Sequence, residues 1–201
     1  RIAFVDMNEE KRNHLRKAWP VVERNLPEIL DDFYDKVMSR ADLAAIIGDE
    51  QNIPGLKGAQ SKHWATLFSG KFDQQYLEEV KRIGRAHERI GLTPEAYVSG
   101  YNYILGEIIV ILHRDLKRER NIGALVAAVS TAIIMDMELA ITIYYDETRN
   151  TYQNRLSDIS TNFQETVATL VEALGTSAQN LSGAAEDLVT SAEDTRGRVG
   201  E

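Results

Sequence analysis

The chain has 201 residues, 43% of them apolar, a net charge of −8 and no cysteine. This length predicts one globular domain with an extension, and the apolar content is sufficient for a buried core. The lack of cysteine excludes disulfides, thiolate metal ligands and cysteine nucleophiles, and the acidic balance argues against a nucleic-acid partner.

The first quarter of the chain has a helical pattern. Residues 8–19 are polar and charged and predict a surface helix ahead of the main fold, which Pro20 and Pro27 separate from the next segment. An amphipathic helix is expected to follow, with Tyr34 at the edge of its apolar face. The residues of that face are Leu26, Ile29, Leu30, Phe33 and Val37.

Shorter elements come next. A turn-like helix is expected over residues 41–47, a loop over residues 52–55, and a helix over residues 56–68. One side of this last helix carries Leu56, Ala59, His63 and Leu67. The first histidine of interest, His63, therefore shares a helix face with small and apolar side chains.

A second histidine, His87, lies on the apolar stripe of the following helix, close to its end. The stripe consists of Tyr76, Val80, Ile83, His87 and Ile90, separated by steps of three and four residues. Gly91 is expected to end this helix, and Thr93-Pro94 to start the next one. A neutral imidazole in this setting suits an axial ligand of heme iron, but a core histidine bonded to a carbonyl or to water gives the same pattern.

Two long helices are predicted over residues 94–120 and 122–150, each apolar over more than one stripe. One side of each can face the domain core and the other a second copy of the chain, which gives a dimer built on a four-helix bundle. Residues 122–145 are long enough to span a bilayer, but Asp136 and Glu138 near the middle would be costly in lipid. We therefore predict a buried helix and no membrane span.

The composition changes after residue 150, where Ser, Thr, Ala, Glu and Asp dominate. A heptad pattern fits this segment, and seven of its ten core positions are apolar. These positions are Ser160, Phe163, Val167, Leu170, Leu174, Ser177, Leu181, Ala184, Leu188 and Ser191. We therefore expect a globular domain over residues 1–150 and, over residues 151–201, a helix that begins a coiled coil.

Two sequence blocks carry a family resemblance. The first is His63-Trp-Ala-Thr-Leu-Phe-Ser-Gly70, and the second is Ile83-Gly-Arg-Ala-His-Glu-Arg-Ile-Gly-Leu92 followed by Pro94-Glu-Ala-Tyr97. Together they resemble the sensor globin domain of globin-coupled sensors, bacterial and archaeal heme proteins that include the aerotaxis transducers. The resemblance covers about residues 8–150. It implies an all-α globin fold and a non-covalent heme b (iron protoporphyrin IX), with His87 as the ligand of the iron.

The resemblance also implies a distal side of the heme. Phe33-Tyr34 matches a Phe-Tyr pair of the family, so Tyr34 would donate its hydroxyl to bound oxygen. Phe33, Leu56 and Ala59 would be apolar walls of the pocket. Ala59 falls where the transducers can carry a threonine, and it cannot supply a second hydrogen bond. From the residues alone, an interfacial tyrosine at position 34 is the alternative.

Further heme contacts follow from the same comparison. Ile83, Tyr97 and Tyr101 would contact the heme from the two helices joined at Gly91, although a core aromatic is an equal alternative for Tyr97. His63 would lie near the heme edge or a propionate, or would bind the iron as a second ligand.

The expected function is a cytoplasmic, homodimeric gas sensor for oxygen, with carbon monoxide and nitric oxide as other possible ligands. Leu181-Ser-Gly-Ala-Ala-Glu-Asp-Leu188 resembles the start of the cytoplasmic domain of methyl-accepting chemotaxis proteins. This implies a chemotaxis output beyond Glu201 and downstream chemotaxis signalling proteins as partners. The histidines form no metal or acid–base set with carboxylates, and no phosphate-binding glycine loop occurs, so an enzyme is not expected. The alternatives are a diguanylate cyclase or kinase output, a heme-free helical scaffold, and a catalytic globin.

Overall fold

A computed structural model describes the backbone of residues 2–199 and the side chains of residues 2–193. This part of the chain is helical and contains no β-strand, so the all-α prediction is confirmed. Its elements are α1 (Glu9–Met38), α2 (Ala41–Ile47), the 3-10 helix η1 (Glu50–Asn52), α3 (Ile53–Phe68), α4 (Gln74–Arg89), α5 (Pro94–Asp115) and α6 (Ile122–Val199). The end of the predicted C-terminal segment, residues 200–201, lies outside the described residues.

The first helix is longer than the sequence suggested. α1 is continuous, so the separate surface helix expected over residues 8–19 is wrong. Leu15 and Ala18, within that polar stretch, are fully buried. Pro20 and Pro27 lie inside the helix. Each proline removes one backbone hydrogen bond, and the apolar burial along the same helix offsets that loss.

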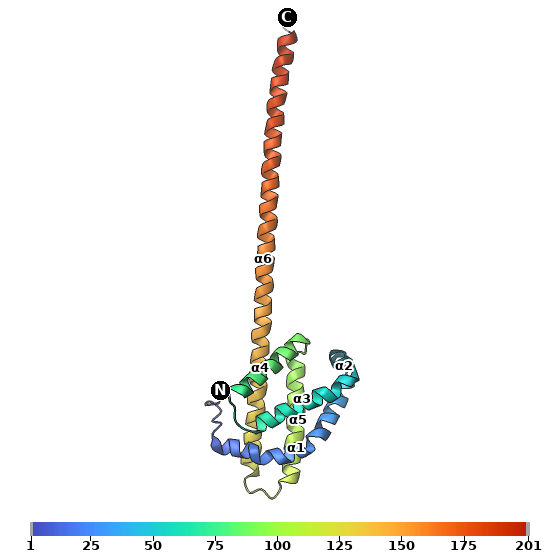
Figure 1. Ribbon diagram of the computed structural model, residues 1–201, viewed down its shortest axis with the longest axis vertical. Helices are drawn as coiled ribbons and strands as arrows, with labels where there is room; N and C mark the ends of the chain where they lie inside the picture. The colour runs from blue at the N-terminus through green and yellow to red at the C-terminus, as the bar shows by residue number, and fades with distance from the viewer. Residues whose placement is uncertain (1, 200–201) are drawn as a thin grey trace. The chain divides into compact units, whose positions relative to one another are not determined.

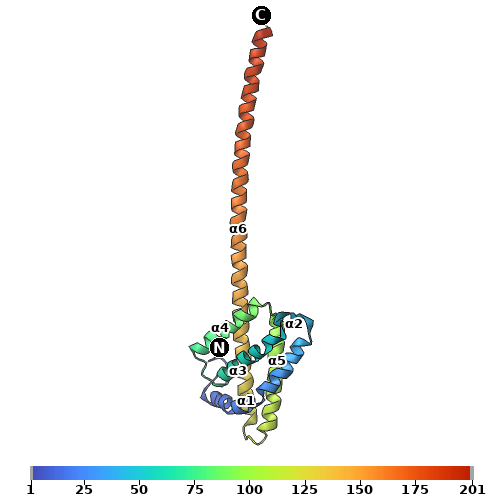
Figure 2. The same cartoon turned by 45° about the vertical axis from the view of Figure 1, so that its right-hand side comes forward.

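The core lies where these helices meet within residues 2–148. α1 packs against both α3 and α5, and it crosses α5 in Figures 1 and 2. The largest fully buried side chains are Leu15, Val22, Leu26, Leu30, Leu67, Phe68, Val80, Ile108, Leu112, Leu125, Val129 and Ile133. Because they come from α1, α3, α4, α5 and α6, one shared core fixes the positions of the helices that carry the candidate site.

Two helix boundaries differ from the expected ones. α3 begins at Ile53, with Pro54 in its first turn, where a loop was predicted. α5 ends at Asp115, before the predicted end near residue 120. The Asp115 carboxylate accepts hydrogen bonds from Arg24 at 2.7 Å and from Asn25 at 3.4 Å. These bonds tie the end of α5 to α1.

By length and composition alone, α6 is apolar enough to cross a membrane, which for one helix is weak evidence. Part of its apolar stretch is covered by the protein itself. The buried residues of this stretch are Leu125, Ala128, Val129, Ala132, Ile133, Met135, Asp136 and Ala140. A charged side chain among them, Asp136, is paired with polar groups of other helices.

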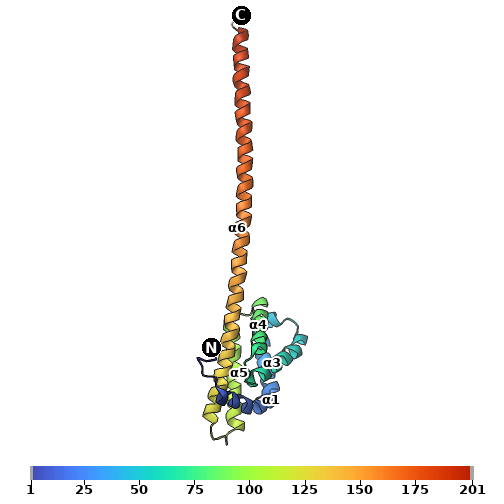
Figure 3. The same cartoon turned by 60° about the vertical axis from the view of Figure 1, so that its left-hand side comes forward.

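The described chain divides into two units between Thr148 and Arg149. In the first unit α4 lies beside α6, where Arg85 donates to Glu147 at 2.8 Å (Figure 3). In the second unit every described side chain, up to Glu193, is exposed. The apolar seam of that unit is uncovered in the single chain, and both the coiled coil and the dimer stay predictions.

Candidate functional site

The end of α4 is closed by a glycine cap that places His87 in its last turn. Gly91 has a φ of 72°, and its amide donates to the Glu88 carbonyl at 3.0 Å. The Leu92 amide donates to the His87 carbonyl, also at 3.0 Å. This pair of bonds is the Schellman arrangement, which only a residue tolerant of the left-handed conformation completes easily. Thr93 then caps α5, so the predicted junction of the two helices is confirmed.

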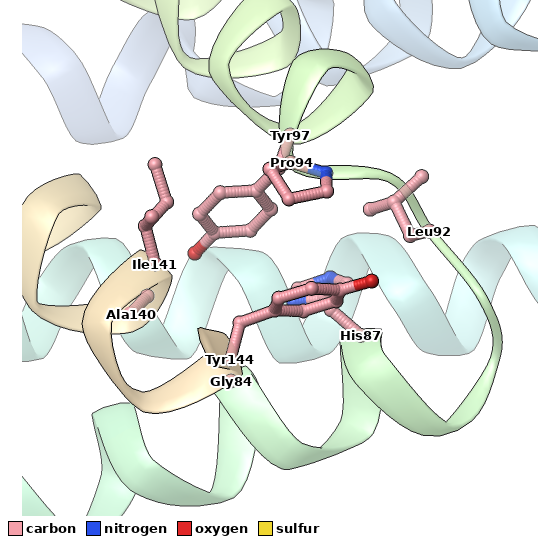
Figure 4. Close-up of a pocket in the computed structure, with 8 residues that line it drawn as sticks. All are labelled: Gly84, His87, Leu92, Pro94, Tyr97, Ala140, Ile141 and Tyr144. Carbon is pink, nitrogen blue, oxygen red and sulfur yellow. The ribbon is translucent and has the colours of Figure 1, made fainter. Parts of the chain in front are cut away.

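A small apolar pocket lies between α4, the start of α5 and α6 (Figure 4). Its lining residues are Gly84, His87, Leu92, Pro94, Tyr97, Ala140, Ile141 and Tyr144. Figure 4 shows the Tyr97 side chain reaching from α5 into the space between α4 and α6. A β-carbon at position 84 would lie 3.0 Å from the Ala140 carbonyl oxygen, so the two helices approach this closely because Gly84 has no side chain.

The His87 ring is neutral in this pocket. Burial lowers its pKa to about 4, and the Ile83 carbonyl one turn earlier offsets only part of that shift. Its Nδ1 atom is buried and makes no regular hydrogen bond within the described residues. A neutral, half-buried imidazole with an unpaired nitrogen among apolar side chains has the properties of a heme ligand, because only the uncharged ring has a lone pair to offer iron.

Two tyrosines of α5 connect His87 to the interior. The rings of His87 and Tyr97 lie 4.8 Å apart between centroids. The Tyr97 hydroxyl donates to the Tyr101 hydroxyl at 3.1 Å, and the Tyr101 hydroxyl donates to Asp136 Oδ2 at 2.6 Å. Burial raises the pKa of both tyrosines, which therefore keep their protons and act as donors.

Asp136 is the centre of this polar cluster. It is fully buried in α6, and besides the bond from Tyr101 it accepts one from Tyr76 at 2.6 Å on Oδ1 and one from His63 Nε2 at 2.8 Å on Oδ2. Its donors thus come from α3, α4 and α5. A buried carboxylate is tolerated when it is paired and hydrogen-bonded in this way.

His63 and Asp136 each stabilise the charged form of the other. Burial alone would lower the pKa of His63, but its bond to Asp136 and the negative charges of Asp136 and Glu79 outweigh that effect and raise it. Burial alone would raise the pKa of Asp136, but the bond and charge of His63 and the bonds from the tyrosines outweigh it and lower the pKa. The two groups therefore form a buried ion pair.

The predicted distal pair lies on α1. Tyr34 is 4% exposed, and its ring meets that of Phe33 edge-on at 5.2 Å between centroids. Burial raises the pKa of Tyr34 to about 12, so its hydroxyl stays a donor near neutral pH. Phe33 is half-buried and stacks on Tyr103 of α5 at 6.1 Å, and Lys57 of α3 lies 5.8 Å from the centre of the Tyr34 ring.

The remaining predicted residues are less enclosed. Leu56 of α3 and Ile83 of α4 are half-buried, and Ala59 of α3 is exposed. The described contacts thus bring His63, His87, Tyr97 and Tyr101 into one connected group, while Phe33 and Tyr34 form a second one. That Leu56, Ala59 and Ile83 contact a heme stays a prediction.

Sequence reasoning missed three parts of the site. The sequence presents Asp136 only as a cost to a membrane helix, although a carboxylate in the most apolar stretch is itself a signal of buried partners. Tyr76 belongs to the predicted apolar stripe, and that pattern indicates no role for its hydroxyl. Gly84 follows Ile83 in the second sequence block, but its packing on another helix could not be read from that block.

Known proteins are similar to this chain in sequence and in structure. Residues 1–150 match the sequence model of the Protoglobin family. The chain is 21% identical over 206 residues to the heme-based aerotactic transducer HemAT of Halobacterium salinarum. That match covers 98% of this chain and 41% of the transducer, so the chain spans about two fifths of its relative's length.

Two solved globin domains have the same fold. The globin domain of the Geobacter sulfurreducens globin-coupled sensor aligns with a TM-score of 0.66 and 21% identity, over 71% of this chain and 94% of that one. The globin domain of E. coli DosC, in a ferric form, aligns with a TM-score of 0.54 and 14% identity, over 70% and 99%. The predicted globin fold is therefore confirmed.

Proposed function

This chain belongs to the protoglobin family, with the globin domain of a globin-coupled sensor, and on that premise we propose that residues 1–150 sense a gas through heme bound at His87. The observation that supports this best is the His87 ring, neutral in an apolar pocket and with Nδ1 unpaired. Heme b, held without a covalent bond, would supply an iron that binds oxygen, carbon monoxide or nitric oxide. The name of the Halobacterium relative, a heme-based aerotactic transducer, agrees with this proposal.

The chain's own residues would hold the cofactor and tune its ligand preference. His87 would supply the proximal nitrogen, and Ile83, Tyr97 and Tyr101 would support it from α4 and α5. Phe33, Leu56 and Ala59 would exclude water on the opposite side. Tyr34, which stays protonated near neutral pH, would donate a hydrogen bond to the gas and so favour oxygen, whose bound form is the most polar.

His63 would act away from the iron. Its Nε2 atom is committed to Asp136 at 2.8 Å, and its ring is buried between that carboxylate and Glu79. A protonated ring has no lone pair for a metal. We therefore assign His63 to the ion pair, in preference to a contact with a propionate or a second bond to iron.

The rest of the proposal concerns signalling. The sensor would act in the cytoplasm as a homodimer and would not be an enzyme itself. Residues 151–201 would pass the signal as a coiled coil toward a chemotaxis output and its downstream proteins. The aerotactic relative favours that output over a diguanylate cyclase or a kinase. Ligand binding can bias such a dimer only if its two arrangements differ in gas affinity.

An absorption spectrum tests the core of this proposal. Purified protein, reconstituted with hemin and reduced, is expected to show a Soret band that shifts on exposure to oxygen and returns when oxygen is removed. A protein that takes up no heme at stoichiometric hemin would favour the heme-free scaffold. Irreversible oxidation of an added substrate would favour a catalytic globin.

A further inference from the structure

The buried carboxylate of Asp136 joins α6 to three other helices by side-chain hydrogen bonds. Oδ1 accepts from Tyr76 of α4, whereas Oδ2 accepts from His63 of α3 and from Tyr101 of α5. The Tyr76 bond on Oδ1 and the Tyr101 bond on Oδ2 therefore begin two separate branches of hydrogen bonds at the carboxylate. Within the part of the chain that the structure describes, only the branch through Tyr101 continues to Tyr97 and to the His87 ring.

The charge of Asp136 fixes the direction of that branch. An ionised carboxylate only accepts hydrogen bonds, so the single proton of the Tyr101 hydroxyl is used on Asp136. The Tyr101 oxygen is then left to accept, and the Tyr97 hydroxyl donates to it at 3.1 Å. Each hydroxyl has one possible orientation as a result, and the Tyr97 ring is held by its far end.

The held ring is also the one packed on His87. The two ring centroids lie 4.8 Å apart with 57° between the planes, and both side chains line the same pocket (Figure 4). A change in the orientation of Tyr97 would therefore alter the surroundings of the His87 ring. On its own helix the His87 ring interacts with the Ile83 carbonyl one turn earlier, although its Nδ1 atom lies outside ordinary hydrogen-bond geometry.

We propose that Asp136 is a positioning residue, which sets the orientation of Tyr97 against His87 through Tyr101 and so couples the His87 ring to helix α6. The coupling works in both directions. A displacement of α6 moves the Asp136 carboxylate, which accepts the hydrogen bond of Tyr101. A displacement of the His87 ring moves the Tyr97 ring, whose hydroxyl donates to Tyr101. His63, which bonds to the same oxygen as Tyr101, keeps the carboxylate ionised. The role in gas sensing rests on the proposed function, whereas the effect on the two rings does not.

Three variants of nearly unchanged shape separate this role from simple support of the fold. Asp136→Asn keeps the volume and removes the charge, and Tyr101→Phe breaks the branch to His87 while the carboxylate stays. Tyr76→Phe is the matched control, because it also deprives Asp136 of one hydroxyl donor but lies on the branch that does not reach His87.

The first measurement uses the heme-free protein, with NMR of 13C-labelled histidine and tyrosine rings. Asp136→Asn and Tyr101→Phe are expected to shift the His87 and Tyr97 ring signals well beyond the shifts in Tyr76→Phe. Equal shifts in Tyr76→Phe and Tyr101→Phe, or unmoved His87 signals in Tyr101→Phe, would overturn the proposal. If Asp136→Asn does not fold, the comparison of Tyr101→Phe with Tyr76→Phe still tests the positioning role.

The second measurement uses the reduced, heme-loaded protein and the iron–histidine stretching band in resonance Raman spectra. Tyr101→Phe is expected to move this band and Tyr76→Phe to leave it at the wild-type frequency. The opposite pattern contradicts the positioning role. Failure of the wild type to bind heme would refute the proposed function alone, since the heme-free measurement would still stand.

Discussion

Gly84 of α4 packs against the backbone of Ala140 of α6, so that a β-carbon at position 84 would lie 3.0 Å from the Ala140 carbonyl oxygen and from Ile143. The contact lies three residues before His87. It sets how closely α4, which carries His87, approaches α6.

Gly84→Ala is expected to destabilise the protein by about 1–3 kcal/mol, because the methyl group must displace a backbone oxygen in a packed contact. The matched control is Gly106→Ala in α5, where a β-carbon would meet nothing within 4 Å. That change should raise stability by about 0.5–1 kcal/mol, since alanine favours a helix over glycine. Urea unfolding of both variants measures the difference, and equal midpoints would contradict the close contact.

His87→Ala is expected to lose most of its heme, because no other described side chain combines a neutral nitrogen with the apolar pocket. The ratio of Soret to protein absorbance after gel filtration measures retention. His113→Ala, at an exposed position of α5, is the control and should retain heme like the wild type. Full retention by His87→Ala would show that another residue holds the iron.

Tyr34→Phe tests the distal hydrogen bond. A neutral hydrogen bond contributes about 0.5–1.5 kcal/mol, so the oxygen dissociation rate should rise roughly 2- to 13-fold while carbon monoxide binding changes little. Stopped-flow measurements of both gases give the two rates. Tyr103→Phe, at the tyrosine that stacks on Phe33, should change neither rate. Equal effects of Tyr34→Phe on both gases would instead indicate a packing role.

The His63–Asp136 pair predicts a dependence of stability on pH. The raised pKa of His63 means that its contribution is complete below the ordinary histidine value of about 6.5 and is lost as the pH rises through the folded-state pKa. The lowered pKa of Asp136 means that its contribution is present above about 3.9 and is lost as the pH falls through the folded-state pKa. The pair should therefore stabilise most between about pH 4 and 6.5.

The difference in unfolding free energy between the wild type and His63→Gln isolates this contribution. His87 is present in both proteins, so its own lowered pKa cancels. The difference should be largest near pH 5–6, roughly between the two reference pKa values, and should shrink toward alkaline pH. A difference that stays constant from acid to alkaline pH would mean that the pair is not charged in the folded protein.

A dimer through α5 and α6 requires exposed apolar side chains on these two helices. Ile133 of α6 is 1% exposed and belongs to the core of the single chain, so it does not form part of that surface. Its neighbour Ile134 is 50% exposed, and Val110 of α5 is 59% exposed. Ile134→Glu and Val110→Glu should give monomers by light scattering, whereas Asn102→Glu at another exposed position of α5 should not. A monomeric wild type at micromolar concentration would refute the dimer.

Much of the local structure could be predicted from the sequence, because it depends on residues a few positions apart. The Gly91 cap, the Thr93-Pro94 start of α5 and the apolar stripe ahead of His87 all involve bonds or contacts within one or two helical turns. The sequence blocks around His63 and His87 also predicted the globin fold and indicated the family. These features need no knowledge of which helices meet.

The tertiary structure alone decided the rest, since it depends on contacts between residues far apart in the chain. Asp136 receives its hydrogen bonds from residues 73, 60 and 35 positions away, and Gly84 meets a backbone oxygen of another helix. Burial of Leu15 and Ala18 against other helices likewise turned an apparently polar segment into part of α1. A buried carboxylate is stable only where its partners converge, and that convergence follows from how the helices pack against one another.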